Sequence, residues 1–210
     1  MITYTVLKSN EELDVVTALI TRVYMREGYI RNIDAESGIT KYLRNKSTKV
    51  FLAKKEGVII GTISLVADGE LGLPMDLIYQ DELKPYRSPK HRLAEVCQFA
   101  IDTQLLVGEG MGASLEVSRN LLALVVSEAR KSECTCVSFT VNPKHKKFYE
   151  LLGALQIGGE KMYPSVENAP ALAYILDIKI APEAKSAQGN KMQQVLSRFV
   201  LGDIATHLKP

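Results

Sequence analysis

The chain has 210 residues, of which 46% are hydrophobic and 24% are charged. This length suits one domain with a tail, and the composition supports a sizeable core rather than a disordered polyelectrolyte. The formal net charge of +2 excludes nucleic-acid binding driven by global charge, although it leaves room for a local basic patch. No apolar run reaches the roughly 18 residues that cross a bilayer, and residues 1–11 lack the pattern of a signal peptide.

Three cysteines, a small and odd number, indicate a reduced protein. Cys134 and Cys136 are too close to bridge within a flat strand, and Cys97 is remote from both. The sequence shows no metal-binding spacing of histidine and cysteine. We therefore expect a cytoplasmic protein without a bound metal.

Apolar spacing predicts strands mixed with single helices along the chain. In order, the predicted elements are a strand at 2–7, a helix from Asn10, as its cap, to Gly28, a short helix at 37–44, strands at 50–54 and 58–66, a short helix at 77–83 with Asp76 as its cap, a strand at 93–101, a helix at 114–131, a strand at 134–141, a short helix at 144–152, and strands at 155–162 and 171–178. The strands at 50–54 and 58–66 form a predicted hairpin. This order indicates an α/β (α+β) fold, in which a mixed sheet has helices on its faces.

The last 30 residues differ in character from the rest of the chain. Residues 181–210 begin with Pro, Ser and Gly and continue with an apolar stripe from Met192 to Val200. We expect one domain at 1–180, followed by a linker and an amphipathic helix at 181–210. The stripe could also serve as a dimer surface.

The strand at 93–101 carries a candidate general base. Strict alternation would place Glu95 on one face with Leu93, Cys97, Phe99 and Ile101. A carboxylate on an apolar face is costly unless it is paired, solvated or functional, and partial desolvation would raise its pKa toward neutral pH. The alternative is a glutamate at a strand end that reaches solvent or a neighbouring arginine.

Three glycines precede the predicted helix at 114–131. Gly108, Gly110 and Gly112 would let backbone N–H groups at the helix start approach a phosphate closely. Their spacing matches neither a P-loop nor a complete dinucleotide fingerprint, and an ordinary flexible loop is the alternative.

The segment 142–153 contains further candidates. Tyr149 could act as an acid or a hydrogen-bond donor at a strand terminus, although Phe148 and Tyr149 could simply pack the helix onto the sheet. His145 has no evident partner and is a poor metal or triad candidate.

A basic run lies between the short helix at 77–83 and the strand at 93–101. It contains Lys84, Arg87, Lys90 and Arg92 and no acidic residue. A solvated loop is the simplest interpretation, and a docking site for an acidic or phosphorylated partner is the sharper one.

Taken together, these segments resemble the GNAT acyltransferase superfamily. Within it they are most similar to N-acyl amino acid synthases of the N-acyltyrosine synthase type, which are related to acyl-homoserine-lactone synthases. The residues that carry the resemblance are RVYMREGY at 22–29, GLPMDLIY at 72–79, LAEV at 93–96, and His145 with Phe148 and Tyr149. The resemblance spans about residues 15–178. It implies a mostly antiparallel central sheet, flanked by helices, whose two central strands splay apart.

The resemblance also implies a reaction. A long fatty acyl group would pass from a thioester to the amine of an amino acid by direct attack, with no permanently bound cofactor. By position, Glu95 is similar to the general base and Tyr149 to the group that protonates the leaving thiolate. Arg22 and Asp76 are similar to polar residues near the acceptor pocket. The alternative for Arg22 is a helix residue that faces solvent, and the alternative for Asp76 is a helix cap.

Beside the base, the strand would supply the rest of the substrate site. Val96, Cys97 and Phe99 are expected there, and a backbone N–H between Val96 and Phe99 would polarise the thioester carbonyl. Cys97 is also a minor candidate for a covalent nucleophile, against the ordinary interpretation of a small buried thiol.

The glycine segment departs from the superfamily pattern. Leu105 or Val107 stands at the usual polar position, and Glu109 would repel a pyrophosphate. We therefore expect acyl carrier protein as the donor, with acyl-CoA as the alternative. Carrier proteins are generally acidic, so the candidate docking residues are Lys84, Arg87, Lys90, Arg92, Lys144, Lys146 and Lys147.

Other functions stay open at this point. One is an acyl-homoserine-lactone synthase, or another GNAT enzyme with a different amine acceptor. Another is a catalytically silent module that binds an acyl group or a carrier protein. The sequence does not choose the acceptor or the acyl chain length.

Overall fold

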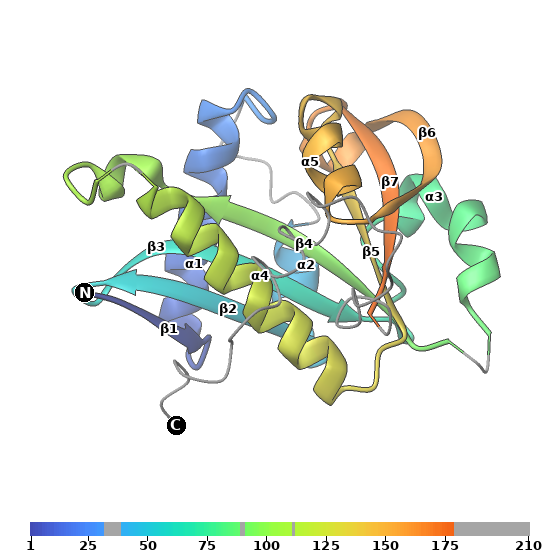
Figure 1. The fold of residues 1–210 in the computed structure, drawn as a ribbon, viewed down its shortest axis with the longest axis horizontal. Coiled ribbons are helices and arrows are strands. Elements are labelled where there is room, and N and C mark those ends of the chain that lie inside the picture. Colours follow the sequence, from blue (N-terminus) through green and yellow to red (C-terminus); the bar gives the residue numbers. More distant parts are fainter. Residues whose placement is uncertain (32–38, 89–90, 111, 179–210) are drawn as a thin grey trace, which may run out of the picture.

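The computed structural model describes residues 1–31, 39–88, 91–110 and 112–178 (Figure 1). Its helices and strands are β1 (Ile2–Val6), α1 (Asn10–Arg26), α2 (Ile39–Leu43), β2 (Thr48–Lys55), β3 (Val58–Ala67), α3 (Asp76–Leu83), β4 (Leu93–Ile101), α4 (Ala113–Lys131), β5 (Cys136–Val141), α5 (Lys146–Leu151), β6 (Leu155–Tyr163) and β7 (Ala169–Asp177). Short 3-10 helices lie at Lys84–Tyr86, Thr103–Leu106, Pro143–His145 and Pro164–Val166. The predicted elements up to residue 178 are therefore present, with small shifts at their ends.

The strands form a 7-stranded sheet in the order β1-β2-β3-β4-β5-β7-β6. Neighbouring strands are antiparallel except for β4 and β5, which are parallel. The last strand in sequence, β7, lies between β5 and β6. The expectation of a mixed, mostly antiparallel sheet flanked by helices is confirmed.

Helices cover both faces of this sheet (Figure 1). On the first face, called the α1 face, α1 buries Val16, Leu19 and Ile20 against the sheet, and α3 lies over the far half. On the opposite face, called the α4 face, α4 buries Val117 and Leu121. The helices form where apolar residues recur at three- and four-residue spacing, which gives each one a continuous apolar stripe.

The structure corrects two predicted helix caps. Ser9, rather than Asn10, caps α1, because its Oγ accepts a hydrogen bond from the backbone N–H of Glu12 at 3.2 Å. Asp76 is the first residue of α3, and Met75 occupies the cap position without a side-chain capping bond. The predicted C-terminal helix, with the stripe from Met192 to Val200, lies outside the described residues, as does Lys90. The division into 1–180 and 181–210 thus stays a prediction.

A β-bulge interrupts β4 at Gln98, whose φ is +54°. On β3, Ser64 pairs with Cys97 and Thr62 pairs with Ala100, so β4 has one extra residue between these pairs. An extra residue reverses the alternation of every side chain that follows it. The expectation that Glu95 shares a face with Phe99 and Ile101 was therefore wrong.

Two separate sets of side chains result from the bulge. Leu93 and Cys97 belong to the core beneath α3, on the α1 face. Val96, Phe99 and Ile101 pack into the core beneath α4. One strand therefore supplies Glu95 to one face of the sheet and large apolar side chains to the other.

The pairing between β4 and β5 is short. It joins Leu93 to Cys136, Ala94 to Val137 and Glu95 to Ser138. Beyond Glu95 the two parallel strands part, which confirms the expected splay between the central strands. The gap begins at the candidate base.

Candidate active site

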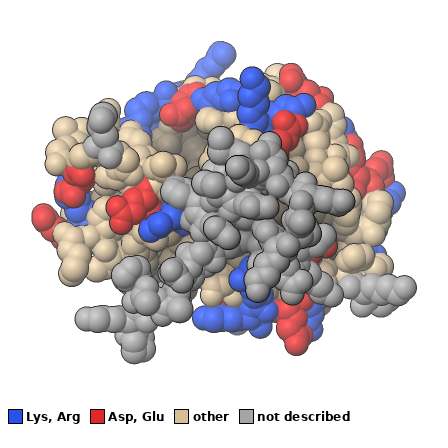
Figure 2. Space-filling view, in the orientation of Figure 1, with Lys and Arg blue, Asp and Glu red and all other residues tan. Residues whose placement is uncertain are grey.

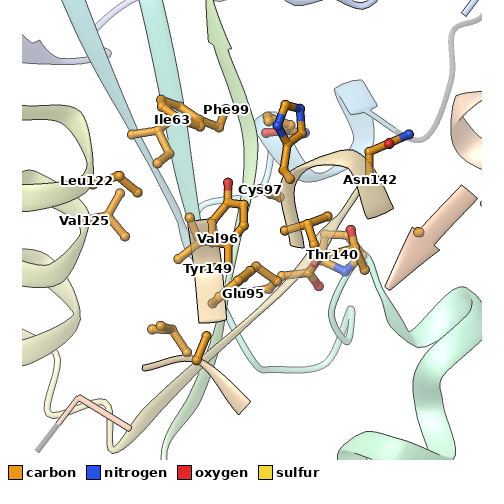
Figure 3. A pocket seen from close by; sticks show the side chains of 18 of the residues that line it. Ile63, Glu95, Val96, Cys97, Phe99, Leu122, Val125, Thr140, Asn142 and Tyr149 are labelled. Atoms are coloured by element: carbon orange, nitrogen blue, oxygen red, sulfur yellow. The ribbon is translucent and has the colours of Figure 1, made fainter. Parts of the chain in front are cut away.

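A cavity of about 470 Å³ lies where β4 and β5 part. It is lined from both faces of the sheet by α4, the five consecutive residues Glu95 to Phe99, β5 and α5. In Figure 3, Leu122 and Val125 extend from α4 toward Val96 and Tyr149, while Thr140 and Asn142 lie on the opposite side. The cavity thus connects the two sides of the sheet through the splay.

The part of the cavity next to α4 is apolar. Ile63, Val96, Phe99, Leu122 and Val125 line it, and all belong to, or pack against, the core beneath α4. Such a lining fits a hydrocarbon chain, because burying apolar surface is favourable by about 25 cal/mol per Å². Val96 and Phe99, which were expected at the substrate site, both line this part of the cavity, and the bulge at Gln98 places Phe99 on the same face as Val96.

The part of the cavity on the α1 face contains the candidate base. Glu95 is 1% exposed, and its Oε2 accepts a hydrogen bond from the backbone N–H of Met75 at 2.8 Å. Burial raises the pKa of the Glu95 carboxyl well above its ordinary value, and the carboxylates of Asp76 and Asp68 act in the same direction. The Met75 hydrogen bond and the positive charge of Arg87 oppose that rise. A carboxyl in this environment binds a proton more tightly than an exposed glutamate does, which suits it to accept a proton.

Cys97 lines the cavity beside this carboxyl. Burial, and to a smaller extent the charge of Glu95, raise the pKa of the Cys97 thiol well above its ordinary value. A thiol that resists ionisation is a poor nucleophile. The environment of Cys97 therefore favours the interpretation of a small packing residue over that of a covalent catalyst.

Tyr149 reaches the cavity from α5. Its ring packs on Phe139 with centroids 5.0 Å apart and on Phe148 with centroids 5.2 Å apart. Burial raises the pKa of Tyr149 to about 12, so the phenol keeps its proton at neutral pH. Tyr149 thus packs the helix onto the sheet and also presents a protonated hydroxyl to the cavity.

Four further tyrosines line the same cavity, and the sequence did not single them out: Tyr24, Tyr29, Tyr42 and Tyr163. Burial raises the pKa of Tyr24, Tyr42 and Tyr163, which keeps these phenols neutral. Two of the four, Tyr24 and Tyr29, lie inside the 22–29 segment that carried the resemblance. That segment was the one signal that could have identified them.

The other expected acceptor residues lie outside the cavity lining. Arg22 donates from Nε to Asp102 Oδ2 at 2.8 Å, and its side chain is 51% exposed. Arg26 donates to the other oxygen of the same carboxylate at 2.9 Å. Both arginines therefore join α1 to the buried Asp102 just after β4.

Asp76 forms an ion pair behind the cavity wall. Arg87 donates from Nη1 and Nη2 to the two Asp76 oxygens, each at 2.6 Å. The same guanidinium donates to the Asp68 carboxylate at 2.7 and 3.1 Å. The three side chains line a separate hollow on the surface. The structure therefore brings Asp76 to Arg87 rather than into the cavity with Glu95.

The three loop glycines also lie outside the cavity lining. Gly108, Gly110 and Gly112 have φ values of +93°, +88° and +107°, a region that favours glycine. Between the first two, Glu109 forms a 2.6 Å ion pair with Lys55 of β2. A carboxylate fixed in this loop disfavours the binding of a pyrophosphate.

The expected docking residues differ in their surroundings. Arg87 is bound to two carboxylates, whereas Lys84 and Arg92 have side chains 69% and 65% exposed and form surface pairs with Asp81 and Glu133. Lys144 pairs with Glu27 and Lys146 pairs with Glu150, while Lys147 is exposed. On the face shown in Figure 2, Lys and Arg side chains alternate with Asp and Glu along the upper edge.

Within the described part of the chain, no group of three His, Cys, Asp or Glu side chains is placed to hold a metal ion. None of the helices at 1–31, 39–88, 91–110 and 112–178 is long and apolar enough to span a membrane.

Comparison with known proteins identifies relatives of this arrangement. A family model described as N-acyl amino acid synthase FeeM matches residues 15–177. The solved structure of FeeM, an N-acyl amino acid synthase from uncultured soil microbes, is 35% identical, with a TM-score of 0.76 over 85% of this chain and 91% of that one. A search among curated proteins finds no match.

More distant structures share the fold. An N-acetyltransferase from Staphylococcus aureus Mu50 is 14% identical, with a TM-score of 0.55 over 85% of this chain and 99% of that one. An acyl-CoA N-acyltransferase from Pseudomonas aeruginosa is 11% identical, with a TM-score of 0.56 over 83% of this chain and 99% of that one. At these identities the likeness concerns the fold alone.

Proposed function

Because this chain belongs to the FeeM family of N-acyl amino acid synthases, we propose that it transfers a long-chain fatty acyl group from a phosphopantetheine thioester to the amine of an amino acid. Membership makes the protein an acyltransferase with the GNAT fold. The donor, the base and the sequence of steps are the proposed parts.

One observation carries the proposal. Glu95 is a buried carboxyl located where β4 and β5 part, inside a cavity that opens to both faces of the sheet. In the proposed reaction it accepts the proton of the attacking amine. Its raised pKa suits this step, because a carboxylate that binds a proton more tightly is a stronger base.

The remaining steps use groups around the same gap. The thioester carbonyl lies against β4 between Val96 and Phe99, where a backbone N–H polarises it and stabilises the developing oxyanion. The amine attacks this carbon, the C–S bond breaks as the intermediate collapses, and Tyr149 gives its proton to the departing thiolate. The raised pKa of Cys97 favours this direct transfer over an acyl-enzyme.

The acyl chain and the acceptor would then occupy different sides of the sheet. The apolar lining of Ile63, Val96, Phe99, Leu122 and Val125 supports a place for the acyl chain beneath α4. The neutral tyrosines Tyr24, Tyr42 and Tyr163 surround the other side, where Glu95 meets the acceptor amine.

We propose acyl carrier protein as the donor. The fixed Glu109 and the position of the loop glycines away from the cavity support a donor without a pyrophosphate. The exposed Lys84, Arg92 and Lys147 are available to meet an acidic carrier. Acyl-CoA is the alternative.

Mass spectrometry of organic extracts tests the reaction. Bacteria expressing the chain should accumulate N-acyl amino acids, and bacteria expressing Glu95→Gln at equal soluble level should not. Acyl-homoserine lactones in the extract would instead identify the related synthase activity. With the purified protein, faster turnover of acyl carrier protein than of the matching acyl-CoA would support the proposed donor, and the reverse order would replace it.

A further inference from the structure

We propose that Arg87, Asp68 and Asp76 form a positioning clamp that holds the turn before α3, and through it the carboxylate of Glu95, in the geometry needed for catalysis. The proposal rests on the proposed role of Glu95 as the base. It gives Asp76 a structural task in place of contact with the acceptor, and it gives Arg87 a task other than docking a partner.

The clamp consists of one guanidinium between two carboxylates. Arg87 makes four hydrogen bonds, of 2.6 to 3.1 Å, to Asp68 and Asp76. The three side chains are only 19–26% exposed. Bidentate, partly buried pairs of this kind have defined geometry, unlike mobile pairs between exposed side chains.

The clamp fixes the turn through Asp76. Its Oδ2, which also contacts Arg87, accepts a hydrogen bond from the backbone N–H of Leu73 at 2.7 Å. Gly72 has a φ of +68°, and a Cβ there would lie 2.7 Å from the same oxygen. The carboxylate therefore occupies space that only a glycine leaves free.

The turn before α3 positions the carboxylate of Glu95. Leu73 and Met75 are both completely buried, so the backbone between them is anchored on two sides. From this anchored segment the Met75 N–H donates to Glu95 Oε2 at 2.8 Å. A continuous series of contacts thus leads from Arg87 through Asp76 and the turn to Glu95.

The clamp also affects Glu95 through charge. The charged and titratable groups that influence it are Asp68, Asp76 and Arg87, and those that respond to its charge are Cys97, Tyr42 and Tyr163. The two carboxylates raise the pKa of Glu95, and Arg87 lowers it. Loss of Arg87 should therefore raise the pKa of Glu95, whereas loss of the Asp68 charge should lower it.

The test compares the pH dependence of kcat in two single variants. With Glu95 as the base, kcat falls as pH drops through the pKa of this group. For Arg87→Gln the acidic limb should move to higher pH, with turnover on that limb lowered about tenfold. For Asp68→Asn the limb should move to lower pH. The KM for the acyl donor should change less than twofold in both.

Lys54→Gln is the matched control. Lys54 pairs with Glu12, and these two side chains are 20% and 23% exposed, similar to the members of the clamp. This pair joins α1 to β2 and has no part in the proposed catalysis. Its loss should lower thermal stability without displacing the acidic limb.

Opposite displacements in Arg87→Gln and Asp68→Asn support the clamp. An unmoved limb in either folded variant, or displacement of both in the same direction, overturns it. Asp68→Asn keeps the Asp76–Arg87 pair, so a limb that does not move to lower pH in this variant overturns the clamp even where Arg87→Gln does not fold. Full turnover by Glu95→Gln would remove the proposed base itself. If Glu95→Gln is inactive but the acidic limb stays in place in Arg87→Gln and Asp68→Asn, only the clamp is overturned and Glu95 remains the proposed base.

Discussion

The backbone N–H of Met75 donates a 2.8 Å hydrogen bond to the buried carboxylate of Glu95. This contact joins the start of α3 to β4 at the point where β4 leaves β5. A buried carboxylate held by a single backbone donor remains poorly solvated, so its charged form is disfavoured. The environment of Glu95 therefore raises the pKa of this carboxyl at a cost to the stability of the fold.

Replacement of the proposed base should abolish most of the activity. Glu95→Gln keeps a carbonyl oxygen for Met75 but cannot take a proton from the amine, so kcat should fall roughly 10²–10⁴-fold. Turnover of the purified variant, with circular dichroism to verify folding, measures this. Glu128→Gln on α4 is a control at a residue outside the cavity lining. Turnover of Glu95→Gln within twofold of the parent would remove Glu95 from the mechanism.

The same variant should gain stability at neutral pH. The folded-state pKa of Glu95 lies above the ordinary value of 4.5, so its protonated form stabilises the fold below pH 4.5, and this contribution is lost as pH rises through the folded pKa. Glu95→Gln, which cannot ionise, should have a higher Tm than the parent at pH 7.5 and a difference near zero at pH 4. Thermal melts at both values test this. A variant that is less stable at pH 7.5 contradicts the assigned shift.

Tyr149→Phe should slow the departure of the thiolate. The substitution keeps the packing on Phe139 and removes the hydroxyl, so we expect kcat to fall at least roughly 10²-fold with KM little changed. A thioester with a more acidic leaving thiol needs less protonation and should recover part of the loss. Tyr174→Phe, a buried tyrosine on the same face but outside the cavity lining, is the control. Equal defects with both thioesters would argue against Tyr149 as the acid.

A larger side chain beneath α4 should shorten the acyl chain that is accepted. Val125 is 1% exposed and lines the apolar part of the cavity, so Val125→Phe would fill that space. Mass spectrometry of the products should show a distribution moved to shorter chains, and the overpacked core should lose about 1–3 kcal/mol. Leu124→Phe is overpacked on the same helix but outside the cavity lining, and should keep the parent distribution. An unchanged distribution in Val125→Phe would place the acyl chain elsewhere.

Two adjacent glycines of β6 should differ sharply in their tolerance of alanine. A Cβ on Gly158 would lie 2.7 Å from the ring of Tyr79, whereas a Cβ on Gly159 would meet no atom within 4 Å. Tyr79 cannot readily retreat, because its hydroxyl oxygen lies 2.7 Å from the carbonyl oxygens of both Gly159 and Ala171, between which its one proton is shared. Gly158→Ala should therefore cost about 1–3 kcal/mol and Gly159→Ala much less, as measured by urea denaturation. Equal costs would show that Tyr79 moves aside.

Most of the fold was predictable from the sequence because the local residue pattern and the tertiary packing agree. The Val- and Ile-rich run at 58–66 forms a strand that is buried on both faces, and the helical spacing of 114–131 marks the side of α4 that the core covers. The bulge was not readable, because the left-handed conformation of Gln98 is held by pairing with β3 and has no local signal such as glycine. Periodicity alone therefore put Phe99 and Ile101 on the wrong face.

The residues of the candidate site could be predicted from the sequence only where they belong to a recognisable motif. Glu95 and Tyr149 fall in segments that resemble the family, and both line the cavity. The partners of Arg22 and Arg87 were not predictable, since Asp102 lies 80 residues from Arg22, and Asp68 lies 19 residues from Arg87 with α3 between them. The resemblance marked Arg22 and the basic run marked Arg87 as binding residues, and only the folded arrangement shows which carboxylates they meet.

The bulge of β4 behaves as an inserted residue. On either side of it, Cys97 stays paired with Ser64 and Ala100 with Thr62. Deletion of Gln98 would therefore restore a regular ladder and leave the later side chains of the strand on their present faces. The length of β4 can thus be changed by one residue while Glu95, Val96 and Phe99 keep their faces of the sheet. Backbone length at the site can therefore be tested without replacing any of these side chains.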